Sequence, residues 1–412
     1  MKVSPVDETT RYDIETSRRT SIQPSGQLGK ETKDSNPIAP IHFWIPERLS
    51  PSLGRRLAAI ASSEDVLRLA VMPDVHEGAS FPNGCVLATR TRIYLEAIGK
   101  DIGCGVSAIQ CNGSANEIAT DSLEAILRGL ESSVPALKHS RVTRIAELPE
   151  ACSPGDLSDR RLRKTAMREG ILQCGTLGRG NHFVELQRDE MGMPWIMVHS
   201  GSRAMGEAIN SLHLSRAVPS AISGLFHLDI AQDAGQAYLN DMAWGVRYAT
   251  ENRLHIINRV ADLLECELGL EVLPDTFINC PHNFAALEKH FGEHWIVHRK
   301  SANSAREGEI GIIPSSMASG SRIVTGRGNP DSLNSSSHGA GRTMSRRAAI
   351  ERITSRKLTA VMRGVVYQRK RTNELLDEAP DAYKNIKDVM QAQSDLVRTE
   401  KTLATILNYK GL

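Results

Sequence analysis

Short apolar runs separated by turn-forming residues dominate much of this chain. From 67 to 110, such runs alternate with Gly, Pro and Asn, which is the pattern of strands joined by loops. Two later runs each carry a histidine at one end, and the segment 294–325 returns to the same pattern. The runs predict strands at 41–45, 182–186, 195–199, 295–297, 310–313 and 322–324.

Three other segments have the wider apolar spacing of helices. Asp121 or Ser122 is suited to cap a helix that carries Leu123, Ile126, Leu127 and Leu130 on one face. The spacing between about 230 and 270 suits long helices. A final helix is predicted over 383–407, where the apolar stripe consists of Ile386, Val389, Met390, Leu396, Val397, Leu403 and Ile406.

The mixture of strands and helices predicts an α+β fold in a single large domain. A chain of 412 residues with 40% hydrophobic content can bury a large core. Neither an internal repeat nor a linker is evident after residue 40, so we expect one domain over 37–412, with mixed or antiparallel sheets surrounded by helices. Residues 1–36 are polar and charged and predict a flexible N-terminal extension.

Charge and cysteine content narrow the class of protein. The 50 basic and 48 acidic residues give a net charge of +2, so nucleic-acid binding would need a local basic patch. One basic cluster, at 160–164, is also the pattern of an ordinary solvated helix face. Seven dispersed cysteines without a CxxC pair argue against a disulfide framework or zinc finger and indicate a reducing compartment. With neither a secretory signal nor an apolar run of about 18 residues, we expect a cytoplasmic protein without membrane contact.

The segment 101–105, Asp-Ile-Gly-Cys-Gly, is the most informative single motif. It sets a carboxylate and a thiol three residues apart on a backbone that glycine allows to bend sharply. Apolar runs at 86–89 and 93–98 precede it, so we expect a strand ending in a tight turn that directs Asp101 and Cys104 to one point. A cysteine beside glycine is more often a packed small hydrophobe, and the motif alone is therefore a weak signal.

Three histidines strengthen the interpretation as a metal site. His182, His199 and His282 each lie at a junction rich in Gly, Ser or Asn, where rigid elements present side chains to a shared cleft. Taken singly, each would more often be a hydrogen-bonded structural residue. His76 is a further candidate, although its neighbours Asp74 and Glu77 are also suited to capping a loop. His298, followed by Arg299 and Lys300, suits contact with an anion better than with a metal.

Imidazole, one thiolate and one carboxylate suit a borderline divalent ion such as zinc, iron or manganese. Ligand type alone ranks zinc first. A cysteine between two groups of ligands can also bridge two ions, because a coordinated thiol loses its proton. Two neighbouring ions are the usual arrangement for phosphoryl chemistry.

The segment 335–342 carries a second chemical element, His338, surrounded by small residues. Histidine is a competent covalent nucleophile, and Arg342 can neutralise a phosphate. On its own the segment is more typical of a flexible loop with an incidental histidine. The serines of 315–321 offer donors that can cradle phosphates, and the same residues would otherwise form a solvated loop.

Together these motifs resemble the RtcB-type RNA ligases. The chain has Asp101-Ile-Gly-Cys104-Gly, Gly180-Asn181-His182-Phe183-x-Glu185, His199-x-Gly-Ser-Arg203, His282-Asn283, His338-Gly-Ala-Gly-Arg342 and Lys410-Gly411 in the family's order. The resemblance covers about residues 40–412 and is specific as a set. It implies the family's α+β fold.

The resemblance implies a GTP- and Mn²⁺-dependent ligase that joins an RNA 3′-phosphate or 2′,3′-cyclic phosphate end to a 5′-hydroxyl end, in RNA repair or tRNA splicing. Cys104 would bridge two Mn²⁺ ions, which displaces zinc as the expected metal. Asp101 and His182 would complete one site, and His199 and His282 the other. His338 would carry GMP as a guanylyl-histidine and pass it to the RNA 3′-phosphate, giving an end capped through a pyrophosphate.

The resemblance further implies a set of nucleotide and phosphate contacts. Arg203 and Arg342 would contact phosphate or RNA. The cofactor contacts would be Asn181, His182, Phe183, Val184, Glu185, His282, Asn283, Pro314, Ser315, Ser316, Met317, Ser321, His338, Gly339, Ala340, Gly341 and Lys410.

The chain departs from the family pattern at several positions. Ser315 and Ala318 stand where the family often has glycine, the segment 300–304 differs from Lys-Gly-Ala-Thr-Arg, and the loop 77–83 differs from the common forms. These differences bear on nucleotide affinity and RNA preference, and they suit a divergent branch that repairs cleaved RNA. Two other functions stay open: a metal-dependent phosphoesterase, which would use the same cluster without His338, and a non-catalytic RNA-binding protein.

Overall fold

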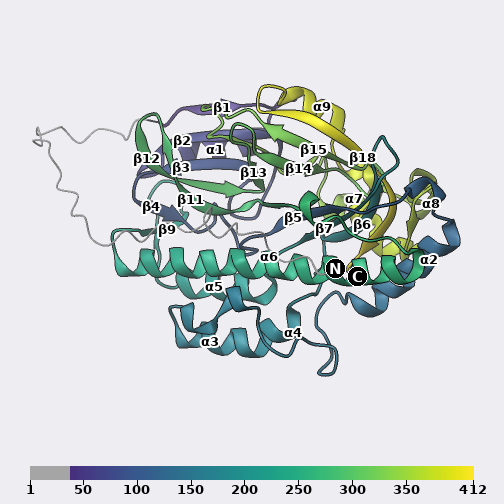
Figure 1. Ribbon diagram of the computed structural model, residues 1–412. Coiled ribbons are helices and arrows are strands. Elements are labelled where there is room, and N and C mark those ends of the chain that lie inside the picture. Colours follow the sequence, from purple (N-terminus) through teal and green to yellow (C-terminus); the bar gives the residue numbers. More distant parts are fainter. Residues whose placement is uncertain (1–37) are drawn as a thin grey trace, which may run out of the picture.

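The computed structural model describes residues 38–412, so the extension expected over 1–36 lies outside the described residues. Two large sheets stand above a long helix, with further helices below it and at one end (Figure 1). The chain is a mixed α+β structure in one domain, as the sequence predicts. Within 38–412, no helix combines the length and apolar content needed to cross a membrane.

The first large sheet contains five strands and runs antiparallel except where its first two strands pair. Its strand β2 is buried over most of its length, and His76 ends it at the cavity described below. Successive side chains of a strand point to opposite faces, so this sheet packs against separate hydrophobic clusters on its two sides. In spatial order the strands are β1 (Ile41–Phe43), β2 (Val66–His76), β3 (Asn83–Thr89), β12 (Glu293–Lys300) and β11 (Asn283–His290).

The second large sheet is nearly closed, because its two end strands β10 and β14 lie close together. Its path is β10 (Ile278–Pro281), β5 (Gly105–Gln110), β7 (Pro194–Ser200), β6 (Phe183–Arg188), β18 (Val397–Lys410), β15 (Ser321–Gly326) and β14 (Ile310–Pro314), and β17 (Val366–Tyr367) pairs with β18. The small sheets consist of β13 (Ala302–Ser304) with β16 (Ser335–Ser337), and of β4 (Arg92–Tyr94), β9 (Phe226–Asp229) and β8 (Val218–Pro219).

The long helix α6 (Asp233–Leu268) separates the sheets from the lower helical layer (Figure 1). It ends at Gly269 in the left-handed conformation, the usual helix C-terminal position for glycine. The other α-helices are α1 (Pro51–Ala61), α2 (Thr120–Ser133), α3 (Arg160–Thr165), α4 (Ile171–Gln173), α5 (Arg203–Leu214), α7 (Arg346–Arg352), α8 (Ser355–Val361) and α9 (Ile386–Ala392). One π-helical turn, Ala166–Gly170, joins α3 to α4, and short 3₁₀ segments lie at Ala115–Glu117, Glu150–Cys152, Pro154–Asp156, Pro274–Thr276, Arg369–Glu378 and Pro380–Ala382.

Most expected elements are present, and three expectations need correction. The helix predicted over 383–407 is wrong, because the chain forms the short helix α9 and then the long strand β18. Helix α2 buries its predicted face, but it begins after Ala119 without a side-chain cap. The turn 101–105 precedes strand β5 and does not end a strand.

Candidate active site

The turn that carries Asp101 and Cys104 closes through a backbone hydrogen bond of 3.1 Å from the Cys104 amide to the Asp101 carbonyl. Gly103 adopts a φ of +69°, and a Cβ there would lie 2.7 Å from the Cα of Val246 in α6. Only glycine therefore fits this turn without displacing the helix beneath it. The result is that both polar side chains project from the start of β5 into one cavity.

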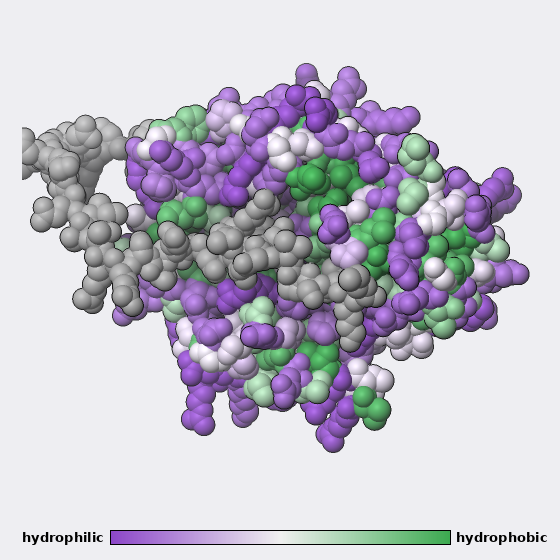
Figure 2. Space-filling view, in the orientation of Figure 1, coloured by the Kyte–Doolittle hydropathy of each residue, from purple (hydrophilic) through white to green (hydrophobic). Residues whose placement is uncertain are grey.

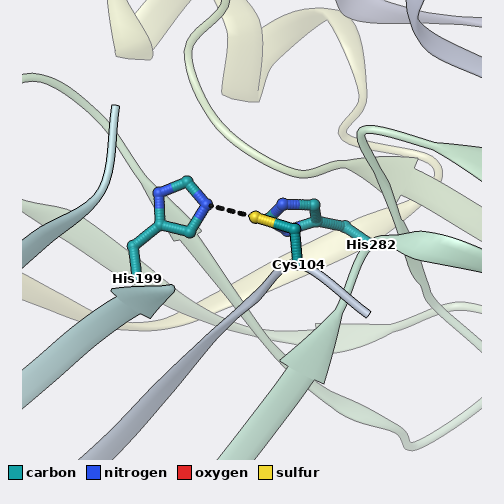
Figure 3. Close-up of side chains that lie close together, drawn as sticks. All are labelled: Cys104, His199 and His282. Carbon is teal, nitrogen blue, oxygen red and sulfur yellow. Dashed lines mark hydrogen bonds between the residues drawn. The ribbon is translucent and has the colours of Figure 1, made fainter. Parts of the chain in front are cut away.

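Five of the predicted metal ligands meet at this point. Cys104, His199 and His282 form one group and Asp101, Cys104 and His182 another, and the ligand atoms within each group lie within 4.8 Å of one another. The Sγ of Cys104 is 3.3 Å from Nε2 of His199 and 3.5 Å from Nε2 of His182. The thiol points toward the ring of His199, with His282 beside it (Figure 3). Cys104 is thus the residue that the two groups share.

Hydrogen bonds on the far side of two rings orient them for coordination. Nδ1 of His182 donates to the Leu177 carbonyl at 2.8 Å, and Nδ1 of His199 donates to the Asn181 carbonyl at 3.2 Å. A carbonyl can only accept, so Nδ1 holds a proton in both rings, and Nε2 is the nitrogen that faces the cluster. His282 differs, because its Nδ1 is buried and has no hydrogen-bond partner within residues 38–412.

Burial sets the protonation of the cluster. It holds the pKa values of His199 and His282 well below the ordinary value, so both rings are neutral, as metal coordination requires. Burial also opposes ionisation of Asp101, but the hydrogen bond and charge of His182 outweigh it and hold the pKa of that carboxyl below its usual range. Burial and the charge of Asp101 raise the pKa of the Cys104 thiol well above normal. A cation at this point would reverse that effect.

The donor set is therefore suited to a divalent metal. Three imidazoles, a carboxylate and a thiol converge at one place, and the unpartnered nitrogen of His282 lacks any other explanation among the described contacts. The geometry groups the ligands in the same division that the family resemblance implies.

A cavity of about 1340 Å³ connects the cluster to His338. The ring of His338 lies against that of His282, with centroids 4.6 Å apart. Strand β16, which leads into His338, is fully buried, so this histidine follows a rigid strand and not the flexible loop that the segment taken alone suggests. The cavity is large enough to hold a drug-sized or nucleotide-sized ligand.

Asp74 controls the orientation of His338. Its Oδ2 accepts from Nδ1 of His338 at 2.6 Å and from the backbone amides of His338 and Gly339 at 3.2 and 3.3 Å. The Asp74 side chain is completely buried, whereas 13% of the His338 side chain is exposed. With Nδ1 held in this way, Nε2 is the ring nitrogen left to react.

A group of cations surrounds one buried carboxylate in the cavity wall. Glu378 accepts from Lys410 Nζ at 2.7 Å, from Arg342 Nη1 at 3.2 Å and from Arg346 Nη1 at 2.5 Å. Burial opposes ionisation of Glu378, but Lys410 and Arg346 outweigh it and keep its pKa low. Arg346 also pairs with Asp377, so three cations face two carboxylates, and the positive charge that remains in this group suits a phosphorylated ligand.

The predicted contact residues divide between the cavity wall and positions behind it. Val184 is packed in the hydrophobic core, and Ser321 is buried with its Oγ accepting from Gln187 at 2.9 Å. His182 lies on the metal side of the cluster. The residues in the wall are Asn181, Phe183, Glu185, His282, Asn283, Pro314, Ser315, Ser316, Met317, His338, Gly339, Ala340, Gly341, Arg342 and Lys410.

Three basic or aromatic side chains that were expected near phosphate lie outside the cavity and make their polar contacts within the protein. Arg203 lies behind the cluster, where its guanidinium donates to Thr176 Oγ1 and to the Ala136 carbonyl. The anion contact expected at His298 is wrong, because this ring is fully buried and both nitrogens bond to backbone. Arg299 points away from the cavity and pairs with Glu288, whereas Lys300 lines the cavity.

Sequence reasoning missed two acidic residues of the site. Asp74 lies in an apolar strand, and a carboxylate there needs a buried partner, which was a usable signal. Glu378 lies in a polar segment rich in charged residues, where nothing distinguishes it before the chain is folded. Arg346 and Lys384 line the same cavity and were also not singled out.

The chain is similar to known proteins over most of its length. The family described as "tRNA-splicing ligase RtcB" matches residues 56–411. The RNA-splicing ligase RtcB of Escherichia coli K12 is 36% identical over 376 residues, which cover 83% of this chain and 90% of that protein. The RNA-splicing ligase RtcB of Mycobacterium tuberculosis is 26% identical, with 85% and 99% coverage. The tRNA-splicing ligase RtcB of Thermococcus kodakarensis is 27% identical, with 78% and 82% coverage.

Proposed function

Because this chain belongs to the RtcB family of tRNA-splicing ligases, we propose that it is an RNA ligase that uses GTP and Mn²⁺. It joins an RNA end bearing a 3′-phosphate or 2′,3′-cyclic phosphate to an end bearing a 5′-hydroxyl. The RNA ends that it joins would arise during RNA repair or tRNA splicing.

One observation carries this proposal more than any other. His338 opens on the same cavity as the Cys104 cluster, and Asp74 holds its Nδ1 at 2.6 Å so that Nε2 faces the cavity as the reactive nitrogen. A metal-dependent phosphoesterase would need the cluster alone. A histidine oriented in this way, in a cavity whose wall carries Arg342, Arg346 and Lys410, instead suits transfer of a nucleotidyl group.

In the proposed first step, Nε2 of His338 attacks the α-phosphorus of GTP. A nitrogen–phosphorus bond forms, the bond between the α-phosphorus and the oxygen bridging to the β-phosphate breaks, and pyrophosphate leaves. An oxygen of the RNA 3′-phosphate then takes the GMP from His338, giving a 3′-end capped through a pyrophosphate. Finally the RNA 5′-hydroxyl attacks the 3′-phosphorus and expels GMP. A cyclic phosphate is first opened by water to the 3′-phosphate.

Asp101, Cys104, His182, His199 and His282 would hold the metal. Bound there, Mn²⁺ would supply positive charge that offsets the charge on the attacked phosphates. Asp74 keeps His338 in the tautomer that can attack, and Arg342, Arg346 and Lys410 offset charge in the wall.

The positions at which the chain departs from the family pattern differ in how closely they approach the proposed nucleotide-binding cavity. Ser315 lines the cavity, and its amide donates to the Gly320 carbonyl at 2.9 Å. Ala318 instead packs against a hydrophobic cluster, so its methyl group does not face the nucleotide. Ser301 lines the cavity as well. We therefore expect Ser315 and Ser301 to modify nucleotide affinity, and Ala318 to have little effect.

The proposal is tested by incubating the protein with Mn²⁺ and GTP labelled at the α-phosphate. We expect an acid-labile protein–GMP adduct that is lost in His338→Ala. His294→Ala is the matched control, because His294 is an exposed histidine at the start of β12, and this variant should form the adduct normally. Failure of metal-loaded wild-type protein to form any adduct would overturn the proposal. Phosphatase activity without an adduct would favour the phosphoesterase instead.

A further inference from the structure

The basic residues of this chain are not spread evenly. Its 50 basic and 48 acidic residues nearly balance, yet the segment 346–371 contains nine arginines and lysines and a single acidic residue, Glu351. This segment includes α7, α8 and β17 and ends at the start of the 3₁₀ segment Arg369–Glu378. A local excess of this kind can attract a polyanion although the whole chain is almost neutral.

The nine cations separate into two sets. Four of them pair with carboxylates, namely Arg346 with Asp377 and Glu378, Arg347 with Glu351, Lys357 with Asp381 and Arg371 with Glu374. The other five are exposed, and none has a carboxylate within 4.0 Å among residues 38–412. We name these five, Arg352, Arg356, Arg363, Arg369 and Lys370, the α7–α8 basic surface.

The elements that carry this surface are built onto the active-site cavity. They wrap one hydrophobic cluster, which contains Ile353, Leu358 and Tyr367 and also Met317 of the cavity wall. Helix α7 begins at Arg346 in the cavity wall and extends away from it for seven residues, or about 10 Å. At the other end of the segment, Gln368 accepts from the Lys410 amide at 3.0 Å. The segment that carries the basic surface therefore contacts the cavity wall at both of its ends.

Hydrophilic side chains project from this edge of the molecule between paler and hydrophobic areas (Figure 2). Arginine side chains on short helices can reach successive phosphates of a strand, and such contacts place a nucleic acid without reading its sequence. A guanidinium also offers a bidentate fit to phosphate.

We propose that the α7–α8 basic surface binds the phosphodiester backbone of the substrate RNA strand and guides its end into the cavity beside His338. This proposal rests on the proposed ligase function, and it adds the path by which RNA reaches the site. Affinity comes from backbone phosphates, so RNAs of different sequence bind this surface alike.

The basic cluster in and after α3 offers a contrast. Arg160, Arg161, Lys164 and Arg168 are exposed as well, but α3 lies in the lower helical layer, below α6 and away from the sheets that form the cavity (Figure 1). Arg161 is moreover paired with Asp159. An RNA strand bound there would not lead to His338.

Two charge-matched variants test the proposal. The first carries Arg352→Gln, Arg356→Gln, Arg363→Gln and Arg369→Gln, and the second carries Arg160→Gln, Arg161→Gln, Lys164→Gln and Arg168→Gln. Each loses four positive charges at exposed positions, so the global charge changes alike. The α3 variant also loses the surface ion pairs of Arg161 with Asp159 and of Arg168 with Glu169, and such exposed pairs contribute little to stability. The readouts are binding of a short fluorescent single-stranded RNA with a 3′-phosphate, measured over a range of salt concentrations, and protein–GMP adduct formation without RNA.

We expect the α7–α8 variant to bind RNA roughly tenfold more weakly at low salt. The slope of log affinity against log salt should fall by about 0.7 for each phosphate that the variant no longer neutralises. The α3 variant should bind like wild type, and both variants should form the adduct at the wild-type rate. Equal RNA binding by the two variants, with adduct formation and ligation intact, would overturn the proposal and leave the ligase function standing. It would point to an acidic protein as the occupant of this surface. Wild-type protein that neither binds RNA nor forms the adduct would overturn both.

Discussion

The imidazole of His338 can present only one nitrogen to a substrate, because Asp74 holds Nδ1 at 2.6 Å and also accepts from two backbone amides. Asp74→Asn keeps the size of the side chain and replaces an acceptor-only carboxylate with an amide that has one acceptor oxygen. We expect the single-turnover rate of adduct formation to fall by about 100-fold through misorientation of the ring. Metal content, measured on the same protein, should stay at the wild-type level. Adduct formation at the wild-type rate would show that Asp74 does not orient the nucleophile.

A second residue-scale prediction concerns the buried carboxyl of Glu185, which lines the cavity. Burial raises its pKa to about 7, despite hydrogen bonds from Asn408 and Thr405. Since the folded pKa exceeds the unfolded value, the folded chain keeps a proton that the unfolded chain has lost. The associated stability is present at low pH and is lost as pH rises toward and through about 7.

Glu185→Gln cannot titrate, so its advantage over wild type should grow with pH. We expect the difference in unfolding free energy to increase by about 2–3 kcal/mol between about pH 5 and about pH 8. Denaturant unfolding of both proteins across this range measures it. A difference that does not vary with pH would contradict the raised pKa.

Residues whose chemistry shows in the local sequence were predictable, and residues defined by distant partners were not. The five candidate ligands lie at junctions rich in Gly, Ser or Asn, so Cys104 and the three histidines could be singled out from the sequence. Glu378 acquires its role from Lys410, Arg342 and Arg346, which the fold brings to it. A glutamate can be an exposed surface charge or, like Glu378, a buried partner of several cations, and only its burial in the folded protein distinguishes the two cases.

At the scale of elements, the turn before β5 places two of the candidate ligands, Asp101 and Cys104, and Gly103 is its most constrained position. Gly103→Ala adds the strain of a positive φ and a contact of 2.7 Å with the backbone of Val246. Gly308→Ala is the matched control, since Gly308 has a φ of +75° and nothing within 4 Å of an added Cβ. The control should cost about 1 kcal/mol, and Gly103→Ala about 2–4 kcal/mol. Denaturant unfolding and metal content distinguish them, and equal costs would show that the turn tolerates a side chain.

The wrong prediction for 383–407 shows where element assignment from one sequence fails. The apolar spacing of a helix is present in α9, but the predicted helix continues across Ser394 and Asp395 into residues that form the strand β18. In β18 burial alternates with the strand period of two from Leu403 through Thr405 to Leu407, and threonine is frequent in this strand, as in strands generally. Two short apolar patterns of different period joined end to end resemble one long helical stripe when no partner strand is known.

At the scale of the whole molecule, the site is assembled from segments far apart in the chain. The candidate metal ligands lie between residues 101 and 282, whereas His338 directly follows β16 and Lys410 ends β18. The sequence predicted an α+β domain and the members of this cluster, because motif chemistry does not depend on topology. It could not predict a nearly closed sheet with end strands β10 and β14, since strand order depends on long-range pairing.

Because the ligands join β5, β6, β7 and the start of β11, metal binding should stabilise the entire fold. A ligand that binds only the folded state adds about 2.7 kcal/mol when its concentration is a hundredfold above its dissociation constant. We therefore expect Mn²⁺ to raise the melting temperature of metal-free protein, and a chelator to reverse the rise.

Cys104→Ala tests whether the shared thiol is essential for metal binding to stabilise the fold. Since Cys104 belongs to both ligand groups, its loss should abolish tight binding of both ions together with the metal-dependent rise in melting temperature. Cys266→Ala is the matched control, because Cys266 is an exposed free cysteine outside the site, and it should retain the full rise. Elemental analysis of the purified variants measures ion content directly. Retention of two tightly bound ions by Cys104→Ala would show that the two groups bind independently, and that the thiol is not a bridge between them.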